Sequence, residues 1–125
     1  MLSHDAAFSG FSVDDIAAAR AFYRDLLGVD VVAQMDNGLL RLRLAGGQEA
    51  VVYPKADHAP ATFTILNFAV PDIERAVDEL AAAGIETLRY EGFAQDERGI
   101  SRNQGGPPIA WFTDPAGNIL AVLED

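Results

Sequence analysis

The sequence contains no cysteine and only two histidines among its 125 residues. Without cysteine the chain can form no disulfide, no thiolate nucleophile and no Cys-ligated zinc or iron–sulfur site. The two histidines, His4 and His58, leave few groups for acid–base chemistry or metal binding. No hydrophobic run approaches the ~18 residues of a membrane span, and residues 1–5 do not resemble the start of a signal peptide. We therefore expect a cytoplasmic protein with no membrane partner.

Positive charge is also scarce in this chain. Nine Lys and Arg residues stand against 19 Asp and Glu residues, which gives a net charge of −10 with neutral histidines. Nucleic acids and anionic membranes require a basic surface, so neither is an expected partner. A neutral or cationic small molecule suits the charge better. Half of the residues are hydrophobic, so we expect one globular domain over residues 1–125.

The first half of the chain, about residues 5–54, predicts a strand, a helix and three further strands. Asp14 and Asp15 suit the N-terminus of the helix, and Gly28 suits its end. Asp36-Asn37-Gly38 is typical of a hairpin turn. The predicted strands are Ala7–Val13, Val29–Met35, Leu40–Leu44 and Ala50–Tyr53, and the predicted helix runs from Ile16 to Leu27.

The same order returns in residues 62–125, after a connecting segment at about residues 55–61. Phe11–Ile16 (FSVDDI) matches Phe68–Ile73 (FAVPDI) as a strand end followed by a helix cap. Each half therefore predicts a β-α-β-β-β module, and two such modules can cover each other's apolar surfaces. The predicted strands are Thr62–Val70, Ile85–Tyr90, Ile109–Thr113 and Ile119–Leu123, with an optional one near Ile100, and the helix is Ile73–Ala83.

Two further motifs carry a family resemblance. Ala21–Gly28 (AFYRDLLG) and Trp111–Asn118 (WFTDPAGN) resemble the vicinal oxygen chelate superfamily, which includes glyoxalases, bleomycin resistance proteins, fosfomycin resistance enzymes and extradiol dioxygenases. The resemblance covers nearly the whole chain. It implies an α+β fold in which two βαβββ modules form a cupped mixed sheet around a cleft, with the helices on the outer face. It also implies a homodimer.

The resemblance further implies a divalent metal, held by His or Glu at two positions in each module. Three of the matching positions here are Phe8, Ile65 and Ala121. These side chains have no donor atom for a metal. The fourth position falls near Ala50 or Val52, and alternation along that strand predicts Glu49 on the other face. We therefore expect no metal, no other cofactor and no metal-dependent reaction at the usual site.

An apolar cleft without metal suits a small-molecule ligand. The predicted ligand-binding residues are Phe8, Ser12, Arg41, Tyr53, Phe63, Ile65, Asn67, Trp111 and Ala121. Several have alternative roles. Arg41 and Arg43 either hold an anionic group or form a solvated sheet face. Trp111 stacks on a planar ligand or packs in the core, and Asn67 orients a ligand or bonds to backbone.

The favoured function is binding or sequestration of an apolar, aromatic or cationic small molecule without metal. One alternative is an enzyme of the lyase, isomerase or dioxygenase type. It would use a displaced metal site near His58, Glu49 or Asp96, or metal-free acid–base catalysis.

His58 is either a general base or ligand contact, or an exposed side chain of the connection. Residues 91–108 predict a lid, a surface loop or a dimer contact. A third alternative is a dimeric interaction domain.

Overall fold

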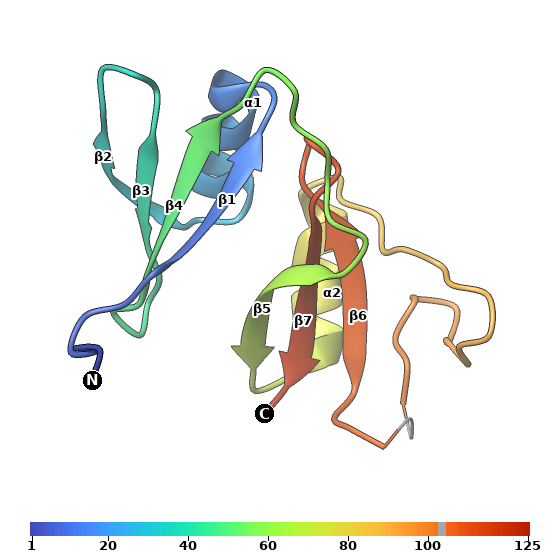
Figure 1. Ribbon diagram of the computed structural model, residues 1–125. Helices are drawn as coiled ribbons and strands as arrows, with labels where there is room; N and C mark the ends of the chain where they lie inside the picture. The colour runs from blue at the N-terminus through green and yellow to red at the C-terminus, as the bar shows by residue number, and fades with distance from the viewer. Residues whose placement is uncertain (103–104) are drawn as a thin grey trace. The chain divides into compact units, whose positions relative to one another are not determined.

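The computed structural model describes residues 1–102 and 105–125 and divides the chain into two units, Met1–Pro60 and Ala61–Asp125. Each unit has one sheet with a helix packed on one face (Figure 1). The α+β class and the duplicated order of strand, helix and strands are therefore confirmed. Within the described residues, no helix has the length and apolar character needed to cross a membrane.

The first unit contains a four-stranded mixed sheet in the order β1-β4-β3-β2. β1 and β4 are parallel, and the other two pairs are antiparallel. Asp15 caps the helix, because its Oδ1 accepts the Ala18 N–H at 3.1 Å. The elements are β1 (Ser9–Val13), α1 (Ile16–Ala21), a π-helical turn η1 (Phe22–Leu26), β2 (Asp30–Gln34), β3 (Leu40–Arg43) and β4 (Glu49–Pro54).

The predicted single helix of residues 16–27 changes character after Ala21. Its last turn is π-helical, and the Leu27 N–H bonds to the Phe22 carbonyl at 3.1 Å. The wider turn brings two consecutive aromatic residues, Phe22 and Tyr23, into the core, where their rings pack edge to face at 5.1 Å. Both rings are therefore part of the core at the point where the helix widens.

The second unit contains a three-stranded sheet in the order β5-β7-β6. The helix α2 (Ile73–Ala82) is capped by Asp72, whose Oδ1 accepts the Arg75 N–H at 3.2 Å. Glu124 Oε2 accepts the Ile73 N–H at 3.0 Å and fixes the same end of the helix to the sheet. The strands are β5 (Thr64–Val70), β6 (Ile109–Thr113) and β7 (Ile119–Glu124).

The predicted strand Ile85–Tyr90 is wrong. Leu88 N–H bonds to the Trp111 carbonyl at 2.7 Å, but the segment forms no strand beside β6. Instead, the side chain of Gln95 accepts the Tyr90 N–H at 2.8 Å and donates to the carbonyls of Leu88 and Gly99. A side-chain amide thus satisfies backbone groups that a strand would have paired.

The optional strand near Ile100 is reduced to two isolated bridges, from Ser101 to Gln95 and to Ile109. Residues 91–102 form a bonded loop around Asp96, whose Oδ1 accepts the N–H groups of Arg98 and Ile100. Asn103 and Gln104, which the sequence placed in the same polar segment, lie outside the described residues.

Candidate functional site

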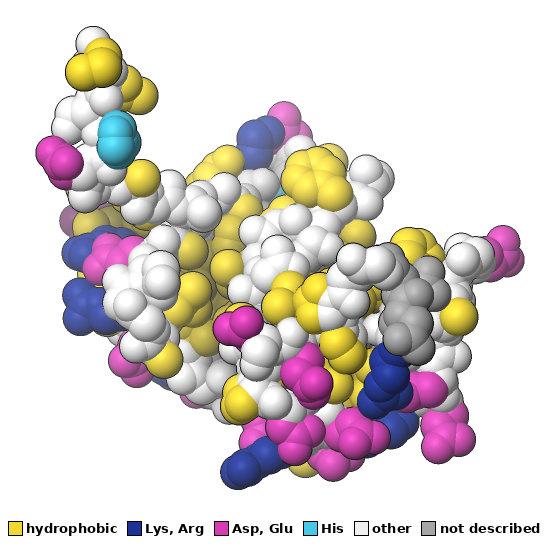
Figure 2. Space-filling model, turned by 90° about the horizontal axis from the view of Figure 1, so that it is seen from below, with side chains coloured by type: hydrophobic (Ala, Val, Ile, Leu, Met, Phe, Trp, Pro, Cys, Tyr) yellow, Lys and Arg dark blue, Asp and Glu magenta, His cyan; other side chains and the backbone are white. Residues whose placement is uncertain are grey.

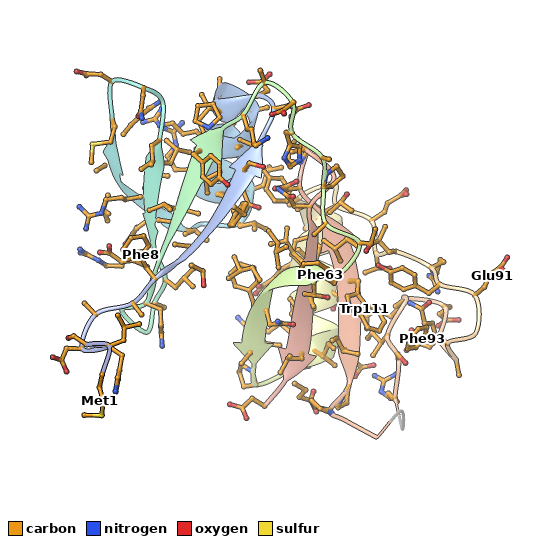
Figure 3. All side chains as sticks on the ribbon, in the orientation of Figure 1. Met1, Phe8, Phe63, Glu91, Phe93 and Trp111 are labelled. Atoms are coloured by element: carbon orange, nitrogen blue, oxygen red, sulfur yellow. The ribbon has the colours of Figure 1, made fainter. Side chains whose placement is uncertain are left out.

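A small pocket on the second unit, here called the aromatic pocket, combines ring side chains from three segments. It has a volume of about 210 Å³. Trp111 comes from β6, Phe63 from the residue before β5, and Phe93 from the loop that follows residue 90 (Figure 3). The full lining is Thr62, Phe63, Thr64, Tyr90, Phe93, Trp111 and Ile119.

Strand alternation places Trp111 in this pocket. Its neighbours Ala110 and Phe112 are buried on the α2 side of β6, so Trp111 lies on the opposite face. Its ring contacts Tyr90 at a centroid distance of 5.2 Å and Phe93 at 5.4 Å, with interplanar angles of 85° and 63°. Such edge-to-face pairs stabilise one another, so the loop rings are held on the tryptophan.

The aromatic pocket carries no charged side chain among its lining residues. Partial burial raises the pKa of the Tyr90 phenol, so its hydroxyl group stays neutral. Phe63 and Phe93 nevertheless remain 68% and 46% exposed. Large exposed rings around a concave, uncharged surface are typical of a site that binds an apolar or planar molecule.

The other predicted residues of the second unit lie beside the pocket or are displaced from it. Asn67, Ala121 and Trp111 form one row across the sheet, although only Trp111 lines the pocket. A bulge in β5 displaces Ile65, because Thr64 lies opposite Ile119 and Leu66 lies opposite Leu120. Thr64 therefore lines the pocket where strict alternation predicted Ile65.

The predicted residues of the first unit form a separate group. Phe8 lies before β1 and is 69% exposed (Figure 3). Ser12 lies opposite Tyr53 across β1 and β4. The Ser12 hydroxyl is 2.6 Å from His58 Nδ1, and this contact is partly buried. The interpretation of His58 as an exposed side chain of the connection is therefore wrong.

Arg41, Arg43 and Glu49 form an ion-pair cluster on the first unit's sheet. Arg41 Nη2 is 2.9 Å from Glu49 Oε1, and Arg43 Nη2 is 3.3 Å from Glu49 Oε2. Register pairing of Arg43 with Glu49 shows that they share a face. Ala50 and Val52 are buried on the other face, so Glu49 lies on the face opposite them, as alternation along the strand predicts. Both arginines already have a carboxylate partner within the chain.

We expect this cluster to make stability depend on pH. The hydrogen bond from Arg41, followed by that from Arg43, lowers the pKa of Glu49 below its ordinary value. A lowered pKa in the folded state stabilises the fold above the ordinary pKa, and this stabilisation disappears as the pH falls through the lowered one. Glu49→Gln should therefore lower the melting temperature at neutral pH and leave it unchanged in strong acid. Glu91→Gln, at an exposed loop position (Figure 3), is the control, and an equal effect there would contradict the cluster's role.

The side chains that the family resemblance matched to the metal positions offer no donor to a metal. Phe8 and Ile65 carry no donor atom, and Ala121 is a fully buried methyl group in β7. Among residues 1–102 and 105–125, no three His, Asp or Glu side chains gather in a way that could hold a metal ion. Glu49 is paired with arginines, and the position sought near Ala50 or Val52 lies under α1.

Asp96 was a candidate for a displaced metal site. Its carboxylate instead accepts hydrogen bonds from residues of its own loop. Burial would raise its pKa, but hydrogen bonds from the Ile100 N–H, Arg102 and the Arg98 N–H outweigh that effect and lower it. Arg102 Nη1 lies 2.6 Å from Asp96 Oδ2. The carboxylate therefore accepts three hydrogen bonds, from the Arg98 N–H, the Ile100 N–H and Arg102, and these give it a structural role in its own loop.

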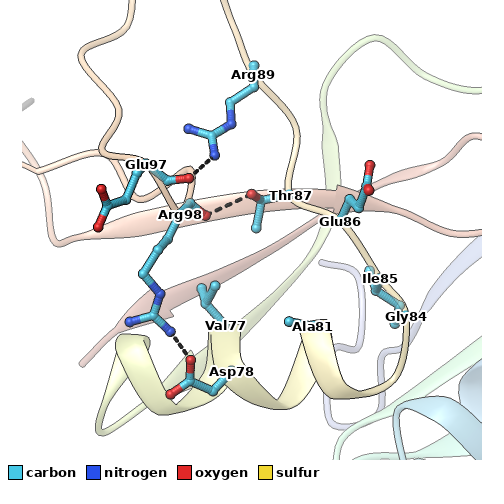
Figure 4. A pocket seen from close by; sticks show the side chains of 10 residues that line it. All are labelled: Val77, Asp78, Ala81, Gly84, Ile85, Glu86, Thr87, Arg89, Glu97 and Arg98. Atoms are coloured by element: carbon cyan, nitrogen blue, oxygen red, sulfur yellow. Dashed lines mark hydrogen bonds and ion pairs between the residues drawn. The ribbon is translucent and has the colours of Figure 1, made fainter.

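A larger groove of about 610 Å³ lies between α2 and the segment from Gly84 to Arg98 (Figure 4). Its polar groups bond to one another: Arg89 donates to the Glu97 carbonyl, Thr87 to the Arg98 carbonyl, and Arg98 to Asp78. None of the predicted site residues lines it. Acidic side chains lie beside basic ones at several places on the face seen in Figure 2, as expected for a solvated surface. The aromatic pocket is the better candidate.

Tyr90 and Phe93 are the two aromatic residues of the pocket that the predicted ligand-binding set omitted. Tyr90 ends the segment that was predicted as a strand and Phe93 follows it, so no strand alternation reaches the loop that carries Phe93. The available signal was the presence of two aromatic residues, three positions apart, at the start of an otherwise polar segment. The Gln95 side chain bonds to the Tyr90 N–H and the Leu88 carbonyl, so it holds the backbone that carries the Tyr90 ring.

Comparison with known families gives one match over most of the chain. The model described as "Glyoxalase/Bleomycin resistance protein/Dioxygenase superfamily" matches residues 7–122. A search of curated proteins found no match.

Solved structures share the fold at low sequence identity. A glyoxalase family protein from Bacillus anthracis is 20% identical, with a TM-score of 0.74 and coverage of 100% of this chain and 99% of that one. The antibiotic binding protein TnmS3 from a Streptomyces species is 20% identical, with a TM-score of 0.71 and 98% coverage of both chains. The fosfomycin resistance protein FosX from Listeria monocytogenes is 14% identical, with a TM-score of 0.73 and coverage of 100% and 95%.

Proposed function

The chain belongs to the Glyoxalase/Bleomycin resistance protein/Dioxygenase superfamily, and from this premise we propose that it binds or sequesters an apolar, aromatic or cationic small molecule without a metal. The observation that carries the proposal is the aromatic pocket, with Trp111, Tyr90 and Phe93 in mutual contact and Phe63 on its rim. Stacking on such rings favours planar ligands.

The chemistry of the family's metal positions supports the metal-independent part of the proposal. A FosX structure contains Mn(II), which shows that this fold can carry a metal in a relative. In this chain, the positions that match the family's ligands hold Phe8, Ile65 and Ala121. Apolar side chains at these positions are consistent with a ligand that is bound by aromatic rings and not by a metal.

The homodimer, the cytoplasmic location and the single-domain organisation remain part of the proposal. They rest on the family resemblance and on the composition of the sequence. The net charge of −10 supports a ligand that is neutral or cationic and disfavours nucleic acid as a partner. An antibiotic binding protein with this fold supports the ligand class without identifying the ligand.

The only tryptophan of the chain lies in the aromatic pocket, so its fluorescence reports binding there directly. We expect acridine, a neutral planar probe, and its cation N-methylacridinium to quench Trp111 fluorescence saturably, and a chelator to leave both titrations unchanged. Phe63→Ala and Phe93→Ala should each weaken binding roughly 3- to 10-fold, because an aromatic pair contributes about 0.5–1.5 kcal/mol.

Phe8→Ala is the matched control for this titration. Phe8 is as exposed as Phe63 but lies outside the aromatic pocket. Unchanged binding in Phe8→Ala, with losses in the two pocket variants, supports the proposal. Equal losses in all three variants, or the absence of saturable quenching with either probe, would contradict it.

A further inference from the structure

A serine–histidine pair on the first unit is left unused by the aromatic pocket. The Ser12 hydroxyl oxygen lies 2.6 Å from His58 Nδ1, and the two residues are 46 positions apart in the sequence. A separation of 2.6 Å is at the short end for a hydroxyl hydrogen bond. The contact is partly buried, so water competes with it only in part. A hydroxyl group this close to an imidazole is the arrangement of a nucleophile and its base.

Backbone bonds fix the position of His58 relative to β1. The Lys55 N–H donates to the Val13 carbonyl at 2.9 Å, which ties the chain after β4 to the end of β1. The His58 N–H then donates to the Lys55 carbonyl at 3.1 Å and closes a turn. The imidazole is therefore presented to Ser12 by a held turn rather than by a free connection between the units.

Ser12 is half-buried on the sheet of the first unit. Val13, next in the strand, is fully buried, so Ser12 lies on the opposite face of the sheet from this core residue. Its partner across the strands is Tyr53, a ring that is 39% exposed. An apolar ring beside a hydroxyl nucleophile offers a surface for the acyl part of a substrate.

We propose that Ser12 and His58 form a nucleophile–base pair that accepts acyl groups from activated esters. With Nδ1 unprotonated, the Ser12 O–H donates to it. Ser12 Oγ attacks the acyl carbon, its proton passes to His58 Nδ1, and the alkoxide or phenolate of the ester leaves as the carbon–oxygen bond breaks. His58 then returns the proton to the leaving group, and Ser12 carries the acyl ester. Catalysis of this kind requires no metal and is independent of the aromatic pocket.

The experiment uses p-nitrophenyl acetate with the full chain, following release of p-nitrophenolate and locating the acetyl group by peptide mass spectrometry. We expect acetylation at Ser12. Ser12→Ala should abolish it. His58→Gln should slow it about 100-fold or more, because a positioned base contributes on the order of 10²–10⁴-fold. The glutamine amide can still accept the Ser12 hydrogen bond, so this variant separates the base from a structural partner.

Ser9→Ala is the matched control, since it removes a hydroxyl group from the same strand at an exposed position. It should react as the parent protein does. Acetyl groups only on lysine side chains or the N-terminal amine would overturn the proposal, as would an unchanged rate in His58→Gln. Melting temperatures of all variants confirm that they are folded. A failure here leaves acridine binding at Trp111 unaffected, so the two proposals are tested separately.

Discussion

Phe112→Ala should destabilise the second unit by about 3–5 kcal/mol, the usual range for removal of a buried phenylalanine ring. Phe112 is 1% exposed and lies on the α2 side of β6, between Trp111 and Thr113. Its strand partner Leu120 is also fully buried, so neighbouring side chains cannot fill the cavity without moving the sheet. Urea unfolding followed by Trp111 fluorescence measures the change in the unit that carries the substitution.

Phe63→Ala provides the comparison, because it removes the same ring from a position that is 68% exposed. We expect its free energy of unfolding to change by less than about 1 kcal/mol, since little buried surface is lost. A similar loss in both variants would mean that Phe112 does not occupy a packed core. The two variants also distinguish aromatic residues that stabilise the core from those that bind a ligand, because Phe63→Ala should weaken acridine binding without unfolding the protein.

Asp114→Ala should destabilise the same unit by roughly 3 kcal/mol, because it removes the acceptor of three hydrogen bonds in a buried turn. Asp114 Oδ1 accepts the N–H groups of Ala116 and Asn118 at 3.0 and 2.9 Å, and Oδ2 accepts from Asn118 Nδ2 at 3.0 Å. Asp114 and Asn118 are both 3% exposed, so water cannot readily replace the lost acceptor. Thermal and urea unfolding measure the loss.

Asp114→Asn tests the assignment of these bonds. Its side-chain carbonyl can still accept both backbone N–H groups, but its amide nitrogen would face Asn118 Nδ2, so one of the three bonds is lost. We expect a smaller effect of about 1 kcal/mol. Equal effects in Asp114→Ala and Asp114→Asn would show that the contact with the Asn118 side chain carries most of the stability. Both variants test the turn at Asp114–Asn118. This turn is part of the motif Trp111–Asn118, which carries the family resemblance.

Locally encoded elements were the most predictable part of this fold. The caps at Asp15 and Asp72 lie where the sequence placed them, because a cap depends on a side chain and an N–H group three residues later. The duplicated order and the family were confirmed from motifs that are contiguous in the sequence. The first helix differs from the prediction after Ala21, where Phe22–Leu26 form a π-helical turn.

Errors in the prediction arose from contacts between residues that the sequence pattern does not connect. Residues 85–90 have the composition of a strand, but the Gln95 side chain takes their backbone bonds. The bulge at Ile65 moves the side chains before Leu66 to the opposite face of the sheet from the one that strict alternation predicts.

The sequence by itself determined the family and most of the order of strands and helices, because these follow from residue types and from spacings within a few positions. The tertiary structure alone decided which rings meet around Trp111, which carboxylate pairs with Arg41, and that Ser12 meets His58. Each of these contacts depends on strand register or on a loop held by side-chain bonds. Such contacts involve residues brought together by folding, and their geometry is not encoded in any local pattern.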